Sequence, residues 1–153
     1  MEYNVKILSP EENMEALLAL LEDTPQVPLV ISGYSMTPFL LHGRDIVFLS
    51  KADRLPKRGD MVLYQRDSGA YVLHRVLRAK NNSFTMIGDA QTRPEPGIRS
   101  DQIRAVVTAV CRRDTVMRKG SFWWDFFEKV WIGIIPLRPA VRKVYSFIKR
   151  GFL

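Results

Sequence analysis

The sequence predicts a mainly β domain that is preceded by a helix and followed by a helical appendage. Between residues 28 and 111, six short runs rich in β-branched and aromatic residues alternate with turns of Gly, Pro, Asn and Asp. The residues on either side of this region show the apolar spacing of helices instead. Several short strands at such spacing favour an antiparallel sandwich or a partly open barrel.

These changes of pattern divide the 153 residues into three segments. Residues 1–27 form an N-terminal helix and lead-in, in which Pro25 ends the helix. Residues 28–111 form the β-rich domain, and residues 112–153 form a basic, aromatic, helical C-terminal segment. The predicted strands are residues 29–31, 45–49, 60–64, 71–77, 83–87 and 103–110.

The net charge of +7 belongs entirely to the C-terminal segment. Residues 112–153 hold ten Lys or Arg and three Asp or Glu, whereas residues 1–111 hold thirteen of each. A neutral body with a basic tail indicates an anionic partner for the tail. One cysteine, Cys111, excludes an intramolecular disulfide, and with only two histidines the chain is too poor in ligands for a zinc cluster. We expect neither a cofactor nor a metal site.

The C-terminal segment combines three tryptophans, several phenylalanines and many cations. Its longest apolar run, residues 130–137, is shorter than the about 20 residues that span a bilayer. The composition is typical of helices that lie in a membrane interface. We therefore expect residues 121–153 to bind a membrane surface, and residues 1–24 to hold neither a signal peptide nor a transmembrane span. Packing of the aromatics on the β-domain or on a partner is the alternative, nucleic acid is a weaker one, and the oligomeric state stays open.

Ser35 follows the first predicted strand, within the sequence Ser-Gly-Tyr-Ser-Met-Thr-Pro of residues 32–38. A serine is a weak nucleophile and needs a base to take its proton. Of the two histidines, His42 lies in a turn and is most simply a surface residue. His74 lies within the predicted strand 71–77, on the same face as the valines two residues before and after it. Either feature alone is most often structural.

In combination, four ordered motifs resemble those of the signal peptidase I family and its LexA-like relatives. Residues 32–38 resemble the family's nucleophile box, and Lys-Arg-Gly-Asp-Met-Val-Leu at residues 57–63 resembles its "RGDIVVF" strand. Leu-His-Arg-Val at residues 73–76 resembles the box of the general base. Residues 88–96 resemble the last box, typically "GDAN" followed by "PDP". The resemblance covers about residues 28–110 and implies a serine endopeptidase that cuts pre-proteins or peptides after small residues.

The base box holds a histidine where many bacterial members and the LexA group hold a lysine. The resemblance therefore implies the endoplasmic-reticulum and archaeal subtype, with Ser35 as nucleophile and His74 as general base. That subtype places an acidic orienting residue six positions after the "GD" aspartate. Here this position is Glu95, a glutamate in place of the family's aspartate, and Asp89 is the alternative. Because an ordinary histidine titrates near pH 6.5, activity is expected to fall below about that pH.

The position that often supplies a serine hydroxyl to the oxyanion hole of signal peptidases is Gly33 here. We expect the backbone N–H groups from Gly33 to Ser35 to take this role. Two other functions are weighed against the peptidase. A LexA-like self-cleaving regulator is disfavoured because only 34 residues precede Ser35. A non-catalytic membrane-surface or peptide-binding module is disfavoured because both Ser35 and His74 are present.

Overall fold

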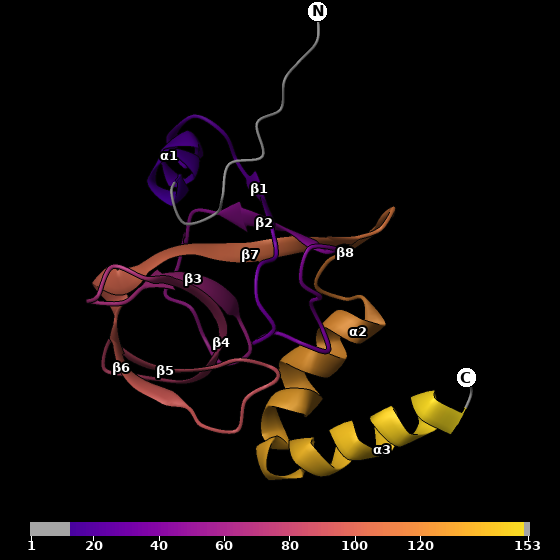
Figure 1. The fold of residues 1–153 in the computed structure, drawn as a ribbon. Helices are drawn as coiled ribbons and strands as arrows, with labels where there is room; N and C mark the ends of the chain where they lie inside the picture. The colour runs from indigo at the N-terminus through magenta and orange to yellow at the C-terminus, as the bar shows by residue number, and fades with distance from the viewer. Residues whose placement is uncertain (1–12, 152–153) are drawn as a thin grey trace, which may run out of the picture.

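The computed structural model describes residues 13–151 as one curled antiparallel sheet with helices against it (Figure 1). Along the sheet the strands follow the order β1-β2-β7-β3-β4-β5-β6, and β8 pairs with β7. The predicted mainly β fold, with a helix before the sheet and a helical C-terminus, is confirmed. The strands are β1 (Val27–Val30), β2 (Ile46–Ser50), β3 (Met61–Gln65), β4 (Tyr71–Lys80), β5 (Ser83–Ile87), β6 (Glu95–Arg99), β7 (Ile103–Arg112) and β8 (Thr115–Met117).

Two of these strands were not predicted. The strand β6 contains Pro96 and Gly97, which the sequence presents as a turn. It lies at an edge of the sheet, where a proline without an N–H costs no internal ladder bond. The strand β8 extends the sheet beyond residue 111 into the segment that was predicted to be helical.

The strands β3 to β6 wrap around an inner hydrophobic cluster (Figure 1). This inner cluster consists of Val62, Tyr64, Val76, Phe84, Met86 and Ile98. Because side chains alternate along a strand, Met61 and Leu63 of β3 point to the other face and join a second, outer cluster. Consequently β3 is buried on both faces, and a polar side chain at its inner face needs a partner within the protein.

The outer cluster joins the helices to the sheet. It contains Met14 and Leu18 of α1 (Met14–Ala19) and three aromatics of the C-terminal segment, Trp124, Phe127 and Trp131. These aromatics lie in α2 (Phe122–Asp125), in the π-helical turn Phe126–Val130 and at the start of the 3-10 turn Trp131–Gly133. For these three side chains, the alternative of packing against the β-domain is therefore the correct one.

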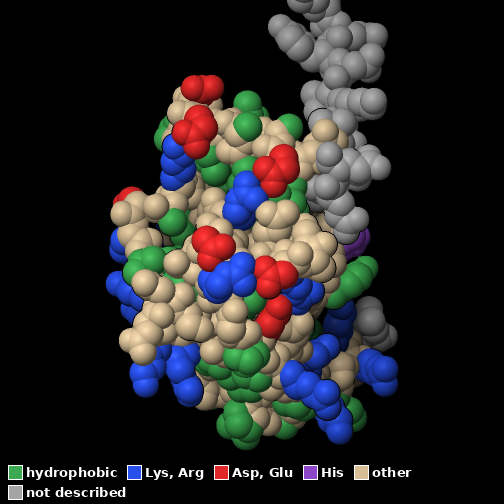
Figure 2. All heavy atoms as spheres, turned by 90° about the vertical axis from the view of Figure 1, so that its left-hand side faces the viewer, with side chains coloured by type: hydrophobic (Ala, Val, Ile, Leu, Met, Phe, Trp, Pro, Cys, Tyr) green, Lys and Arg blue, Asp and Glu red, His purple; other side chains and the backbone are tan. Residues whose placement is uncertain are grey.

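The chain ends in α3 (Arg138–Gly151), which extends away from the sheet (Figure 1). Its first residue, Arg138, is fully buried, whereas every described residue after it is exposed. Figure 2 shows Lys and Arg side chains around hydrophobic ones at the lower end of the molecule, the end at which α3 begins in Figure 1. Among residues 13–151, no helix has the length and apolar character needed to cross a bilayer.

Candidate active site

His74 lies on β4 and points into the inner cluster. Its backbone pairs with Val62 of β3, and alternation puts its side chain on the face of Val72 and Val76. The residue is 3% exposed. Since an apolar environment disfavours the charged imidazolium, burial lowers the pKa of His74 to about 4.

A tyrosine connects His74 to the predicted orienting residue Glu95. The Tyr64 hydroxyl donates to Glu95 Oε2 at 2.8 Å and lies 3.2 Å from His74 Nδ1. Tyr64 is fully buried at the inner face of β3. Burial and the neighbouring Glu95 carboxylate raise the pKa of Tyr64, so its hydroxyl keeps its proton. Glu95 thus reaches His74 through the Tyr64 hydroxyl.

A β-bulge brings Glu95 to this position. Along the β5–β6 ladder, Phe84 pairs with Ile98 but Met86 pairs with Glu95, so β6 carries one extra residue between these pairs. Gly97 has φ +77° within the extra stretch, a conformation that glycine adopts without strain. Because a shift of one residue moves side chains to the other face of a strand, the bulge sets the face on which Glu95 lies.

Arg66 fixes the charge state of Glu95. Its Nε donates to Oε1 at 2.9 Å and its Nη2 to Oε2 at 2.8 Å. These bonds hold the pKa of Glu95 below its usual value, so the side chain is a carboxylate. The negative charge of Glu95 in turn acts to raise the pKa of His74, against the larger effect of burial. Glu95 therefore favours the imidazolium that a base catalyst forms.

Ser35 lies in the loop after β1, against the residues that follow β5. Its carbonyl oxygen accepts a hydrogen bond from the Ala90 N–H at 2.9 Å. A Cβ at Gly88 would lie 2.4 Å from the same oxygen, so only glycine permits this approach. Arg75 pairs with Ile87, and the antiparallel register brings the adjacent His74 and Gly88 to the same end of the ladder. These contacts thus hold Ser35 against Gly88 and Ala90, at the end of the β4–β5 ladder on which His74 lies.

No hydrogen bond joins the Ser35 hydroxyl to His74 within the described chain, and the His74 Nε2 has no hydrogen-bond partner there either. Catalytic hydrogen bonds of unliganded enzymes are often long and tighten only with substrate. Nε2 is consequently the ring nitrogen of His74 that is left without a partner among residues 13–151.

Asp89, the alternative orienting residue, is bound elsewhere. Both of its carboxylate oxygens accept from Arg75, at 3.0 Å from Nε and 2.9 Å from Nη2. Arg75 also donates to the Gly59 carbonyl at 2.9 Å, and the ion pair is completely buried. Since Arg75 follows His74 on β4, its side chain points to the opposite face. The structure therefore connects Glu95, and not Asp89, to His74.

The predicted oxyanion donors differ from one another. The Gly33 N–H donates to His42 Nδ1 at 2.8 Å, which leaves it unavailable to a substrate. His42 is exposed and contacts the Tyr34 ring, with 5.1 Å between the ring centroids. The Ser35 N–H has no acceptor among residues 13–151. Of the two predicted positions, Ser35 is the one with a free backbone donor.

The C-terminal segment supports the loop behind Ser35. The Trp131 Nε1–H donates to the Asp89 carbonyl at 2.8 Å. The buried Arg138 guanidinium donates to the carbonyls of Gly88 and Gln91 at 3.0 and 2.9 Å. The residues that resemble the last family box are thus held from one side by Arg75 and from the other by Trp131 and Arg138.

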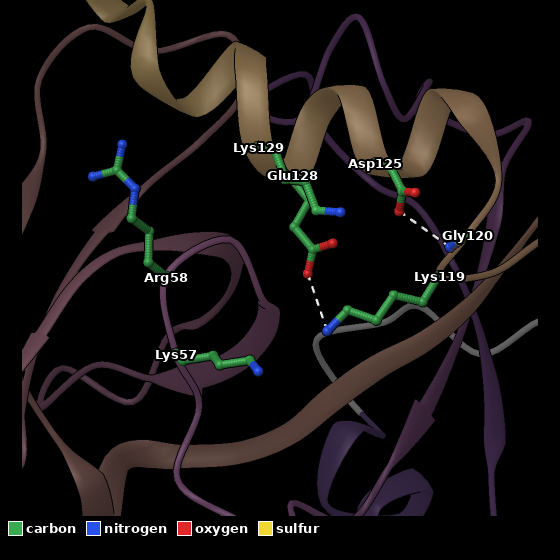
Figure 3. A pocket seen from close by; sticks show the side chains of 7 residues that line it. All are labelled: Lys57, Arg58, Lys119, Gly120, Asp125, Glu128 and Lys129. Carbon is green, nitrogen blue, oxygen red and sulfur yellow. Dashed lines mark hydrogen bonds and ion pairs between the residues drawn. The ribbon is translucent and has the colours of Figure 1, made fainter.

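Among the hollows of the described surface, two that lie outside this hydrogen-bonded group differ in character. A pocket of about 120 Å³ is lined mainly by apolar side chains of β1, β3 and β4, with Ser32 among them. A wider hollow of about 540 Å³ is lined by cations and acids (Figure 3). There Lys119 pairs with Glu128 at 3.2 Å, and Asp125 accepts from the Gly120 N–H at 3.1 Å. None of the predicted catalytic residues lines the wider hollow.

Sequence reasoning missed Tyr64, Arg66 and Arg138. Tyr64 lies in a strand where an aromatic residue is expected in the core. Its partners are revealed only by the three-dimensional pairing of β3 with β4 and of β6 with β5.

No group of three or more His, Cys, Asp or Glu side chains in the described part of the chain could hold a metal ion. Comparisons of this chain with protein-family models, with curated proteins and with solved structures found no match.

Proposed function

We propose that the protein is a serine endopeptidase of the signal peptidase type, with Ser35 as nucleophile and His74 as general base. The observation that supports this best is the hydrogen-bonded chain from Glu95 through Tyr64 to a buried His74. A nucleophile, a base and a third group that orients the base form the arrangement by which serine peptidases are recognised.

In the proposed reaction, Ser35 Oγ attacks the peptide carbonyl carbon while His74 Nε2 takes the hydroxyl proton. The Ser35 N–H donates to the oxyanion that forms. His74 then returns the proton to the leaving amine, and the C–N bond breaks to give an acyl-enzyme. Water, deprotonated by the same nitrogen, releases the acid and restores Ser35. Glu95 stabilises the imidazolium of both steps.

The pocket beside Ser32 supports a peptide substrate with small apolar side chains. Its volume of about 120 Å³ suits a side chain of a few carbon atoms. Among residues 13–151, the strand β1 pairs with β2 alone, so its other edge can pair with an extended peptide. Leu29 of β1, Ile31 just after it and Leu73 of β4 border the pocket, and we propose that a substrate side chain binds between them.

The test is cleavage of a quenched fluorescent peptide library with Ala or Ser before the scissile bond. Ser35→Ala and His74→Ala are expected to lower kcat/KM by roughly 10³-fold or more, because a triad acts as a unit. Ser68→Ala, in an exposed turn, is the matched control that retains activity. Circular dichroism checks folding. Cleavage by either folded variant at the wild-type rate, or no cleavage by the wild type, would overturn the proposal.

We also propose that the protein works at an anionic membrane surface, to which it binds through α3. On this helix, Val141, Val144, Tyr145 and Ile148 recur at helical spacing, and all are exposed. The helix carries four exposed cations and no acidic residue: Arg142, Lys143, Lys149 and Arg150. An apolar stripe bordered by cations fits the interface of an anionic bilayer, where each basic residue contributes about 1 kcal/mol.

Co-sedimentation with vesicles of phosphatidylcholine alone, or with phosphatidylglycerol added, tests this localisation. Ile148→Asp is expected to weaken binding to the anionic vesicles roughly tenfold or more, because it puts a charge into the apolar stripe. Val116→Asp on β8 removes a similarly exposed side chain and serves as control, since Val116 is 47% and Ile148 50% exposed. Failure of the full-length protein to bind at low salt, displacement by duplex DNA, or a soluble dimer that covers α3 would each contradict the proposal.

A further inference from the structure

The two histidines use the same ring nitrogen in opposite ways. His42 Nδ1 lies 2.8 Å from the Gly33 backbone N, and His74 Nδ1 lies 3.2 Å from the Tyr64 hydroxyl. In a neutral imidazole one nitrogen carries a hydrogen and the other accepts. A backbone N–H can only donate, so His42 Nδ1 must accept and its proton must be on Nε2.

At His74 the same assignment of donors and acceptors puts the proton on Nδ1 instead of Nε2. The Glu95 carboxylate can only accept, and it takes the single proton of the Tyr64 hydroxyl at 2.8 Å. The two guanidinium bonds from Arg66 keep Glu95 ionised, so the direction of the Tyr64 bond cannot reverse. The Tyr64 oxygen can therefore only accept a hydrogen bond from His74, and His74 Nδ1 must be the donor.

We propose that Glu95 and Tyr64 act as positioning residues that fix His74 in the Nδ1–H tautomer and leave Nε2 unprotonated. The Tyr64 hydroxyl transmits the direction set by the Glu95 carboxylate, and the His74 side chain is almost fully buried. The value of this tautomer for catalysis rests on the proposed peptidase function. The tautomer itself depends only on the hydrogen bonds and can be measured without a substrate.

The experiment is a long-range ¹H–¹⁵N correlation spectrum of the untagged, ¹⁵N-labelled protein at pH 7.5. With only two histidines in the chain, two imidazole patterns are expected. One should show a protonated Nδ1, and the other, lost in His42→Gln, a protonated Nε2. His42 is thus an internal reference of the opposite tautomer in the same spectrum.

Two variants test the cause of the His74 pattern. Tyr64→Phe removes the acceptor, and Glu95→Gln provides an amide that no longer obliges the Tyr64 hydroxyl to point away from His74. In both variants the Nδ1–H pattern of His74 should be lost while the His42 pattern remains, and circular dichroism checks that each variant is folded. On the quenched peptides, kcat should fall roughly 10²- to 10⁴-fold with little change in KM, as when a base holds the wrong tautomer.

A protonated Nε2 on His74 in the wild type would overturn the inference, as would an unchanged His74 pattern in both variants. These outcomes are separate from failure of the peptidase proposal. An inactive wild type with the Nδ1–H tautomer would overturn the peptidase alone. An active wild type with the Nε2–H tautomer would overturn only the positioning role.

Discussion

His74 and Arg75 are neighbours in the sequence, yet they belong to two regions of opposite character. On one face of β4, Arg75 and Asp89 form a buried ion pair in which both carboxylate oxygens are bound. On the other face, the chain from Glu95 through Tyr64 ends at the His74 imidazole, whose Nε2 has no partner among residues 13–151. The first region stabilises the fold because its groups are satisfied. We propose that the second region does chemistry through its unpartnered ring nitrogen.

The largest effect expected from testing these two regions is on the free energy of unfolding of variants at Asp89 and Glu95. Asp89→Asn leaves the Arg75 charge buried without a counter-charge, which typically costs 3–5 kcal/mol of the free energy of unfolding, to order of magnitude. Glu95→Gln should cost less than about 1 kcal/mol, because the Arg66–Glu95 pair is partly exposed. Urea denaturation followed by circular dichroism measures both.

The loss of activity per folded molecule should be larger for Glu95→Gln than for Asp89→Asn, which is the reverse of the order expected for the loss of stability. Glu95→Gln loses turnover while it stays folded, whereas Asp89→Asn keeps the Glu95–Tyr64–His74 chain intact. The opposite result would be a lower kcat but a higher free energy of unfolding for Asp89→Asn than for Glu95→Gln. The roles assigned to the two faces of β4 would then have to be exchanged.

A smaller effect concerns pH. Burial lowers the pKa of His74 to about 4, with Glu95 opposing and Arg66 assisting the shift. The neutral base is therefore retained until the pH approaches about 4, and the acid limb of kcat/KM should lie there instead of near 6.5. The unfolded chain takes up this proton near pH 6.5 and the folded chain does not, so stability should decrease as the pH falls from about 6.5 to 4.

The pH profile is measured between pH 4 and 8 on the quenched peptides, with circular dichroism at each pH to separate unfolding from titration. The bonds from Arg66 hold the pKa of Glu95 below its usual value, so Glu95 adds no limb near pH 6.5. A limb near pH 6.5 in fully folded protein would show that the His74 imidazole is hydrated, contrary to its burial.

Much of this site could be predicted from local patterns. Strand alternation puts His74 on the face of Val72 and Val76, and the spacing of the last motif selects Glu95. The preference for Glu95 over Asp89 came from that offset alone. The reason lies in the alternation that turns Arg75, and with it Asp89, away from His74.

What could not be predicted depends on pairings between distant segments. The bulge at Gly97 sets the register of Glu95. Its sequence, Pro-Gly, is equally typical of a turn, so the pattern alone does not predict the bulge. Trp131 and Arg138 have the composition of a membrane-interface helix, and only the tertiary contacts show that both are buried behind the loop of Gly88. Amphipathic composition does not distinguish a core face from a lipid-facing one.

The outer cluster has a consequence for how the chain reaches this structure. It joins Met14 and Leu18 to Trp124, Phe127 and Trp131, so residues more than a hundred positions apart complete one core. The conformational entropy of these long loops must be lost before the contacts between their ends can form. Folding is therefore slower than in chains whose contacts are local. It also couples all three predicted segments in one cooperative unit. The loop that holds Ser35 in place is therefore expected to form late, once the C-terminal aromatics have docked.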